Sequence, residues 1–326
     1  MSTKTGTPKK HLMLFSGRAH LELAEEVAKH LNVTITPQSA YDFANGEIFV
    51  RFEESVRGSD AFVIQSHCEP INQWVMEQLI MVDALKRASA KRITVIMPFY
   101  PYARQDKKHK GREPISARLI ADLFKTAGAD RIMTVDLHTA QIQGFFDGPV
   151  DHLFGQNLLA EHVAEKYGNE NLVVVSPDAG RTKLAEKWAD QLGGCPIAFI
   201  HKTRDPLRPN EVVANRVVGD INGRMCIVID DMVDTGGTIS KAMAQLLEEG
   251  ASGVVLAATH GVLSGKASQR LAECGAREVI FTNTLPISED KRFPGMTVLS
   301  IAPLLAKAIH EVFEDGSVTS LFNGNA

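Results

Sequence analysis

A chain of 326 residues with 44% hydrophobic and 23% charged residues has the composition of an ordinary globular protein, and its length suggests two domains. The formal net charge of −4 gives no electrostatic reason to expect a nucleic-acid partner. No apolar run is long enough to span a membrane, and the segment from Met1 to Lys10 is polar, so we expect a cytoplasmic protein with no membrane partner.

Apolar strand-like runs alternate with helical patterns along both halves of the chain. This alternation predicts an α/β fold in which mostly parallel sheets are flanked by helices. The first half contains predicted strands at 11–15, 61–65, 93–97 and 131–135, and predicted helices at 20–31, 73–87 and 115–126. The second half contains predicted helices at 154–167, 182–192 and 264–272, and predicted strands at 172–175, 197–200, 226–229, 254–259 and 278–281.

An internal repeat supports two similar domains. Leu246–His260 aligns without a gap with Phe124–His138, each reading as a helix end, a Gly-Ala exit, a strand and a histidine. We therefore expect domains at 1–153 and 154–326. The alternative is that the two aligned segments, each leading into a strand, are similar only by chance.

The most informative stretch is residues 226–240. Four apolar residues, Cys226 to Ile229, predict a buried parallel strand that ends at two carboxylates. A Gly turn before a helix N-terminus suits a phosphate, and nearby carboxylates suit sugar hydroxyls or a hydrated Mg²⁺. The stretch therefore predicts a sugar-phosphate site, the alternative being an ordinary turn with solvated acids. Its key residues are Asp230, Asp231, Asp234, Thr235, Gly236, Gly237 and Thr238.

Two other strand ends carry groups suited to phosphate or metal. The loop Phe99–Pro114 places Arg104, Gln105 and Asp106 where a ligand can meet them, and a triphosphate would match its charge. The alternative for its later basic residues is a solvated charge run. His138 and Asp178 follow further strands and could each hold Mg²⁺, although a lone histidine is more often an ordinary hydrogen-bonded residue.

Residues 200–211 predict an exposed flap without regular structure. Lys202 and Arg204 are two residues apart and could close over a reacting phosphoryl group, the alternative being a polar surface loop. Near the N-terminus, Asn45-Gly46 between strand-like runs predicts a hairpin turn, which by itself says nothing about a ligand.

Taken together, these stretches resemble the ribose-phosphate pyrophosphokinase family, in its class I form, over about residues 11–322. The segments that carry the resemblance, in the family's order and spacing, are FANGEIFVRFEESVRG, PFYPYARQDKK, VDLHTAQIQGFF, SPDAG, HKTR and VIDDMVDTGGTIS. The last segment alone would indicate only the wider phosphoribosyltransferase group.

The resemblance implies two phosphoribosyltransferase-like domains, the first diverged and the second with the sugar-phosphate loop and flap. It implies a Mg²⁺-dependent transferase that makes 5-phosphoribosyl 1-diphosphate and AMP from ATP and ribose 5-phosphate, for nucleotide biosynthesis. It also implies a homohexamer that is activated by phosphate and inhibited by ADP. Ser317–Phe322 resembles the family's C-terminal segment near that regulatory site. The alternatives are a phosphoribosyltransferase that consumes the activated sugar and a catalytically silent regulatory homologue.

Site roles follow from the same resemblance, residue by residue. Lys202 and Arg204 match catalytic flap residues, with Arg104 as a further catalytic candidate, and His138 and Asp178 match metal positions. The ATP positions are Asn45, Gly46 and Glu47, from a neighbouring subunit, with Arg104 and Gln105. The ribose-5-phosphate positions are Arg204, Asp230, Asp234, Thr235, Gly236, Gly237 and Thr238, to which the carboxylate pattern adds Asp231.

One position departs from the family pattern. Arg181 follows Ser-Pro-Asp-Ala-Gly, where many members have a small residue. An arginine there could add an anion contact at a helix start or face solvent.

Overall fold

The computed structural model describes residues 10–205 and 208–322, with side chains outside the described part at 179 and 202–215. The chain forms two compact units. The first contains the described residues up to Phe154 together with those from Ala302 onward, and the second spans Gly155–Ile301. The expected domain boundary at 153/154 is one residue away from this division. The residues from Ala302 onward, expected in the second domain, lie in the first unit.

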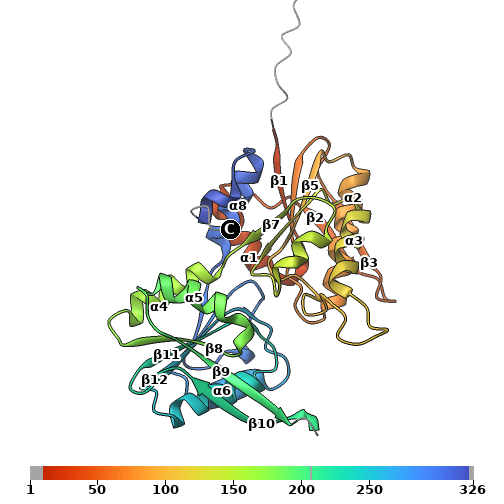
Figure 1. The fold of residues 1–326 in the computed structure, drawn as a ribbon. Helices are drawn as coiled ribbons and strands as arrows, with labels where there is room; N and C mark the ends of the chain where they lie inside the picture. The colour runs from red at the N-terminus through yellow and green to blue at the C-terminus, as the bar shows by residue number, and fades with distance from the viewer. Residues whose placement is uncertain (1–9, 206–207, 323–326) are drawn as a thin grey trace, which may run out of the picture. The chain divides into compact units, whose positions relative to one another are not determined.

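A five-stranded parallel sheet forms the centre of the first unit, in the order β1-β4-β5-β6-β7 (Figure 1). Its strands are β1 (Leu12–Ser16), β4 (Asp60–Ile64), β5 (Arg92–Met97), β6 (Arg131–Val135) and β7 (Val150–Leu153). Its helices are α1 (Leu21–Leu31), α2 (Ile71–Arg87), α3 (Ser116–Ala127) and α8 (Ala302–Phe313), with short 3-10 turns η1 (Arg18–His20), η2 (Ala140–Phe145) and η5 (Val318–Phe322). The edge strand β7 thus lies at the C-terminal end of the expected first domain, 1–153.

A separate antiparallel hairpin of β2 (Gln38–Asp42) and β3 (Ile48–Phe52) belongs to the first unit. This confirms the hairpin predicted from Asn45-Gly46. The carboxylate of Asp42 accepts hydrogen bonds from Arg18 Nη2 at 2.6 Å and from Gln73 Nε2 at 3.0 Å, which fixes the hairpin to the body of the unit.

The second unit has a seven-stranded sheet in the order β10-β9-β8-β11-β12-β13-β14. Every neighbouring pair is parallel except β10 with β9. The strands are β8 (Leu172–Ser176), β9 (Ile197–Asp205), β10 (Arg208–Val218), β11 (Met225–Val233), β12 (Gly253–Gly261), β13 (Glu278–Thr282) and β14 (Met296–Leu299). The helices are α4 (Gln156–Tyr167), α5 (Thr182–Gln191), α6 (Gly237–Glu248) and α7 (Ala267–Glu273), with 3-10 turns η3 (Ala179–Arg181) and η4 (Glu289–Lys291).

Burial of β11 on both faces explains its unbroken apolar run. Cys226 and Val228 lie in the core beneath α6 and α7, whereas Ile227 and Ile229 lie in the core beneath α4 and α5 (Figure 1). The expected α/β class with two mostly parallel, helix-flanked sheets is confirmed.

The aligned repeat also has a structural counterpart, because β6 lies beside β5 as β12 lies beside β11. Its two histidines differ, however. His138 follows the end of β6, whereas His260 is buried within β12.

Candidate active site

The loop Asp234–Gly236 and the first two residues of α6, Gly237 and Thr238, follow β11 at the carboxyl edge of the second sheet. Gly236 precedes the helix with φ of 71° and ψ of −10°, a left-handed conformation that glycine adopts without strain. Thr235 and Thr238 are exposed. The first amides of α6 have no partner within the helix, so the loop and the helix start offer backbone donors, hydroxyl groups and a positive dipole end to an anion.

Contacts from the next connection hold this loop in place. Arg270 Nη1 on α7 donates to the carbonyl oxygen of Thr235 at 2.7 Å, and the Ser264 amide donates to that of Asp234 at 3.0 Å. A Cβ atom added at Gly236 would lie 3.4 Å from the Ala267 backbone, so the loop packs closely on the start of α7. Sequence reasoning missed Arg270, because no local pattern connects it with a loop 35 residues earlier.

Asp230 and Asp231 were expected to follow the strand, but they lie within β11. The strand pairs with β8 only as far as Val228, yet it continues along β12, where Asp230 is opposite Ala258. Both carboxylates therefore lie on a part of β11 that extends beyond its pairing with β8 and is paired only with β12. Their side chains are 20% and 7% exposed, respectively.

Arg181 is the counter-ion of this pair in the structure. Its Nη1 atom lies 3.0 Å from Asp230 Oδ1 and 2.6 Å from Asp231 Oδ1. Burial raises the pKa of Asp230 above its ordinary value, the Arg181 charge opposes that rise, and the Asp231 charge adds to it. Burial would lower the pKa of Arg181, but the attraction of both carboxylates outweighs it and raises that pKa.

Asp178 follows the end of β8, the strand next to β11. Its side chain accepts the Gly180 amide at 2.9 Å, and its carbonyl accepts the Ser176 hydroxyl at 2.6 Å. These bonds shape the turn that places Arg181 three residues after Asp178. Because β8 and β11 are neighbours, the predicted metal residue and the predicted sugar residues share one sheet edge.

The flap expected to be irregular is a two-stranded antiparallel ribbon. β9 pairs with β8 through Phe199 and then continues to Asp205, paired with β10. Lys202 and Arg204 lie on this extension, opposite Asn215 and Val212, and their side chains are outside the described part of the structure. The expectation of a loop was wrong because backbone pairing, which a polar sequence does not prevent, orders the segment. Three adjacent strands, β9, β8 and β11, thus supply predicted site residues.

In the first unit, the loops after β5 and β6 are joined by one buried carboxylate. Asp106 Oδ2 accepts hydrogen bonds from Thr139 Oγ1 and Gln141 Nε2, each at 2.9 Å. Thr139 follows His138, so this bond places the Arg104 loop beside the predicted metal histidine. Asp106 is 6% exposed, and its contacts make it a residue that positions the loops.

The ligand-facing candidates of this loop are exposed. Arg104 and Gln105 both have exposed side chains, and Gln105 is fixed by a hydrogen bond that its Oε1 accepts from the Ser116 hydroxyl at 2.6 Å. The later basic residues are exposed as well: Lys107, Lys108, Lys110 and Arg112.

The remaining ATP candidates form the tip of the β2–β3 hairpin. Asn45, Gly46 and Glu47 are exposed, and the Asn45 side chain accepts the Glu47 amide at 3.2 Å. Gly46 has φ of 87°, which requires glycine for an unstrained turn. Tyr41 and Phe43 on the same hairpin are 47% and 46% exposed, and their rings are in edge contact at 5.4 Å. The hairpin forms a sheet of its own, so it does not share the strand ends that carry Arg104 and His138.

Within the described ranges, no three or more His, Cys, Asp and Glu side chains are grouped so as to hold a metal ion. Mg²⁺ in nucleotide sites is usually bound by one or two carboxylates, with substrate phosphates and water as the other ligands. Asp178, with carboxylate oxygens at the sheet edge, fits that ligand chemistry. None of the helices in the described part of the chain combines the length and hydrophobicity needed to cross a bilayer.

An anion-binding loop at a helix start, carboxylates on the preceding strand and a parallel sheet edge define a sugar-phosphate or nucleotide-binding α/β protein. Residues 12–128 match the model for the N-terminal domain of ribose phosphate pyrophosphokinase, and residues 206–323 match the phosphoribosyl synthetase-associated domain. The chain belongs to the ribose-phosphate pyrophosphokinase family.

Individual relatives agree over nearly the full length. The chain is 73% identical to a ribose-phosphate pyrophosphokinase of Mycobacterium tuberculosis over 318 residues, covering 98% of each chain. It is 67% identical to that of Corynebacterium glutamicum over 317 residues, covering 97% of each. The crystal structure of phosphoribosylpyrophosphate synthetase from Mycobacterium smegmatis matches with a TM-score of 0.90 and 71% identity, covering 94% of this chain and all of that one. The family expected from sequence is confirmed.

Proposed function

We infer that the chain catalyses transfer of the β,γ-diphosphate of ATP to the anomeric hydroxyl of ribose 5-phosphate, giving 5-phosphoribosyl 1-diphosphate and AMP. It is a transferase of nucleotide biosynthesis. The observation that carries this function is the Asp234–Thr238 loop at the start of α6, beside the Asp230 and Asp231 carboxylates, in a chain that matches the family from end to end.

In the proposed sugar site, the 5-phosphate binds the loop amides and the Thr235 and Thr238 hydroxyls. The ribose hydroxyls, or a cation bound to them, contact Asp230 and Asp231. The left-handed Gly236 and the contact from Arg270 support this placement, because they fix the loop before a substrate arrives.

In the proposed ATP site, Arg104 and Gln105 contact the nucleotide, and Asn45, Gly46 and Glu47 are contributed by another copy of the chain. The exposed hairpin tip and its exposed aromatic rings support a role in contact between copies. A homohexamer follows as the proposed assembly, and a solution mass other than that of six chains would argue against it.

Mg²⁺ is the proposed cofactor, with His138 and Asp178 holding it directly or through water. When bound, it would neutralise negative charge on the transferring phosphates. Phosphate is proposed as activator and ADP as inhibitor, near Ser317–Phe322. The cytoplasm is the proposed location, which fractionation of cells would test.

In the proposed reaction, the anomeric oxygen attacks the β-phosphorus of ATP as the bond from that phosphorus to the AMP oxygen breaks. The anomeric hydroxyl releases its proton, and AMP leaves in line. The protein positions both substrates, and Lys202, Arg204 and Arg104 neutralise the developing charge. Extension of β9 beyond its pairing with β8 supports a flap role for Lys202 and Arg204.

We predict that Lys202→Ala lowers kcat by about 10³-fold, because a cation that contacts the transferring group stabilises mainly the transition state. The KM for ribose 5-phosphate should change little. Steady-state AMP release measures both constants. Lys307→Ala, at an exposed lysine of α8, is the matched control and should behave as wild type. Near-normal turnover of Lys202→Ala would overturn the flap role.

The same assay separates the two alternative functions. A phosphoribosyltransferase would release no AMP from ATP and ribose 5-phosphate, and would leave the Arg104 loop without a task. A silent regulatory homologue would release none even with Mg²⁺ and phosphate supplied, although Lys202, Arg204 and His138 are all present.

A further inference from the structure

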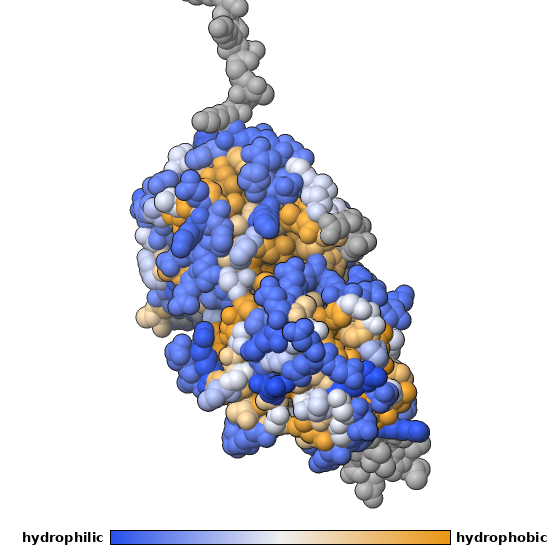
Figure 2. Space-filling model, turned by 90° about the vertical axis from the view of Figure 1, so that its left-hand side faces the viewer, coloured by the Kyte–Doolittle hydropathy of each residue, from blue (hydrophilic) through white to orange (hydrophobic). Residues whose placement is uncertain are grey.

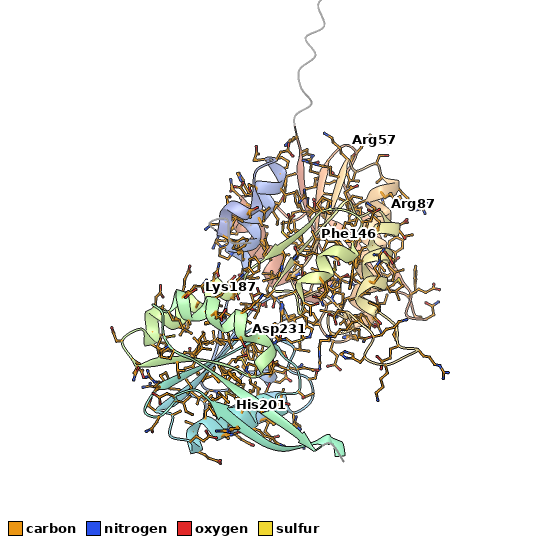
Figure 3. All side chains as sticks on the ribbon, in the orientation of Figure 1. Arg57, Arg87, Phe146, Lys187, His201 and Asp231 are labelled. Atoms are coloured by element: carbon orange, nitrogen blue, oxygen red, sulfur yellow. The ribbon has the colours of Figure 1, made fainter. Side chains whose placement is uncertain are left out.

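We propose that Arg181 occupies the Asp230 and Asp231 carboxylates in the substrate-free protein and competes there with ribose 5-phosphate and its cation. One guanidinium nitrogen, Nη1, reaches Oδ1 of both carboxylates, at 3.0 and 2.6 Å. Asp231, which lies on β11, is labelled in Figure 3. The proposal rests on the proposed placement of the ribose at this pair.

Because the fold buries Asp230 and Asp231 side by side, the two carboxylates require a positively charged partner. Asp231 is 7% exposed, Asp230 is 20% exposed, and they are neighbours in one strand. Burying two adjacent negative charges without a partner is strongly unfavourable. The Asp231 amide donates to Asp230 Oδ1 at 2.9 Å, so the oxygen that meets Arg181 is also held by the backbone. Arg181 therefore serves as an internal cation while the site is empty.

The guanidinium and the substrate require the same atoms. Sugar hydroxyls donate to carboxylate oxygens and Mg²⁺ binds them, whereas arginine offers only donors and cannot accept a hydroxyl proton. A guanidinium left on Oδ1 would also repel the cation. The substrate must therefore displace Arg181. The apparent affinity for ribose 5-phosphate decreases as the fraction of molecules in which Arg181 covers the carboxylates increases.

The position of Arg181 in the fold allows this displacement. It ends the three-residue turn η3 between Asp178 and α5, and its side chain is 21% exposed. A long side chain that reaches the pair from a neighbouring strand end can swing away without moving β11. By contrast, Asp230 and Asp231 are fixed within a paired strand.

The test is to replace Arg181 with methionine, which keeps the apolar stem and removes the charge. Calorimetry of the full-length assembled enzyme with ribose 5-phosphate, at fixed Mg²⁺ and without ATP, should give a dissociation constant at least about fivefold lower than wild type. The ligand-free melting temperature should fall, and added Mg²⁺ should raise it more in the variant than in wild type. Lys183→Met is the matched control at an exposed residue two positions away, and it should change none of these quantities.

Arg181→Lys keeps the charge but loses the planar fork, so its dissociation constant should lie between those of wild type and Arg181→Met. If Arg181→Met does not fold, Arg181→Lys decides alone. Affinity equal to or weaker than wild type, in Arg181→Met or in this fallback, overturns the competition and makes Arg181 a substrate contact or a structural residue.

Asp231→Asn distinguishes failure of this proposal from failure of the sugar site itself. Weaker binding of ribose 5-phosphate by Asp231→Asn, without tighter binding by Arg181→Met, would overturn only the competition. Unchanged binding by Asp231→Asn would overturn the placement of the sugar on which the competition depends.

Discussion

Asp106 shows how a single residue can have a role that its position in a motif does not indicate. It follows Arg104 and Gln105 in a loop rich in charge, which makes it look like a third ligand contact. The structure instead buries it and directs its carboxylate to Thr139 and Gln141 after the neighbouring strand. It therefore acts on the nucleotide only through the loops that it holds together.

We predict that Asp106→Ala lowers kcat/KM for ATP by about tenfold, because the Arg104 loop loses both hydrogen bonds to the loop that carries His138. The KM for ribose 5-phosphate should change less. Asp106→Asn keeps an acceptor oxygen and should recover part of the loss. Asp147→Ala, at an exposed aspartate of the same unit, is the control. Equal effects on both substrates would argue for general destabilisation in place of loop positioning.

At the scale of elements, Glu278 joins α4, β13 and β14. Its side chain is 3% exposed and accepts hydrogen bonds from Lys166 Nζ at 2.9 Å and from the Tyr167 hydroxyl at 2.7 Å. His162 and Thr297 also contact it. Burial alone would raise the pKa of Glu278, but these four hydrogen bonds together outweigh it and lower the pKa to about 2.

A carboxylate whose pKa is lower in the folded state stabilises that state above its unfolded pKa, here 4.5, and loses this contribution as the pH falls toward 2. We predict that Glu278→Gln lowers the free energy of unfolding at pH 7 by about 3 kcal/mol, corresponding to the shift in pKa. The difference between the variant and wild type should shrink as the pH falls below about 4.5.

Urea unfolding of both proteins between neutral and acidic pH measures this difference. Glu186→Gln, at an exposed glutamate of α5, should match wild type throughout. A difference for Glu278→Gln that stays constant as the pH falls would show that the charge of Glu278 is not the source of the stability.

At the scale of the whole molecule, the C-terminal helix α8 belongs to the first unit, which begins the chain. Leu305 and Ile309 on α8 are fully buried, and α8 contacts α1. The segment beyond it is joined to the same unit: Asp315 pairs with Arg92 at 2.8 Å, and Phe322 is in edge contact with Phe154 at 5.2 Å. Figure 2 shows hydrophobic residues interspersed with hydrophilic ones on the face that it draws.

We predict that Leu305→Ala lowers the free energy of unfolding of the first unit by about 2–5 kcal/mol, the range for removing a fully buried leucine side chain. Hydrogen exchange followed by mass spectrometry should show faster exchange in α1 and α8 and unchanged exchange in β11 and β12. Lys307→Ala on the exposed face of α8 is the control. Equal acceleration in β11 and β12 would contradict the division of the chain.

The sequence by itself determined the features that depend on neighbouring residues. The apolar run from Cys226 to Ile229 predicts a strand buried on both faces, and Gly236-Gly237 before a helical pattern predicts the loop conformation. Both follow from side-chain periodicity and backbone sterics, which act within a few residues. The family resemblance rests on the same local segments, and it indicates Asp230 and Asp234 as carboxylates of the proposed sugar site.

Only the tertiary structure decided which distant residues meet. The meeting of Arg181 with Asp230 and Asp231 and the return of α8 to the first unit join segments far apart in the chain. Strand pairing and the burial of apolar faces select these contacts, and neither is encoded in a local pattern. The sequence thus specified the chemical groups of the proposed sugar site, whereas packing supplied the arginine that covers its carboxylates.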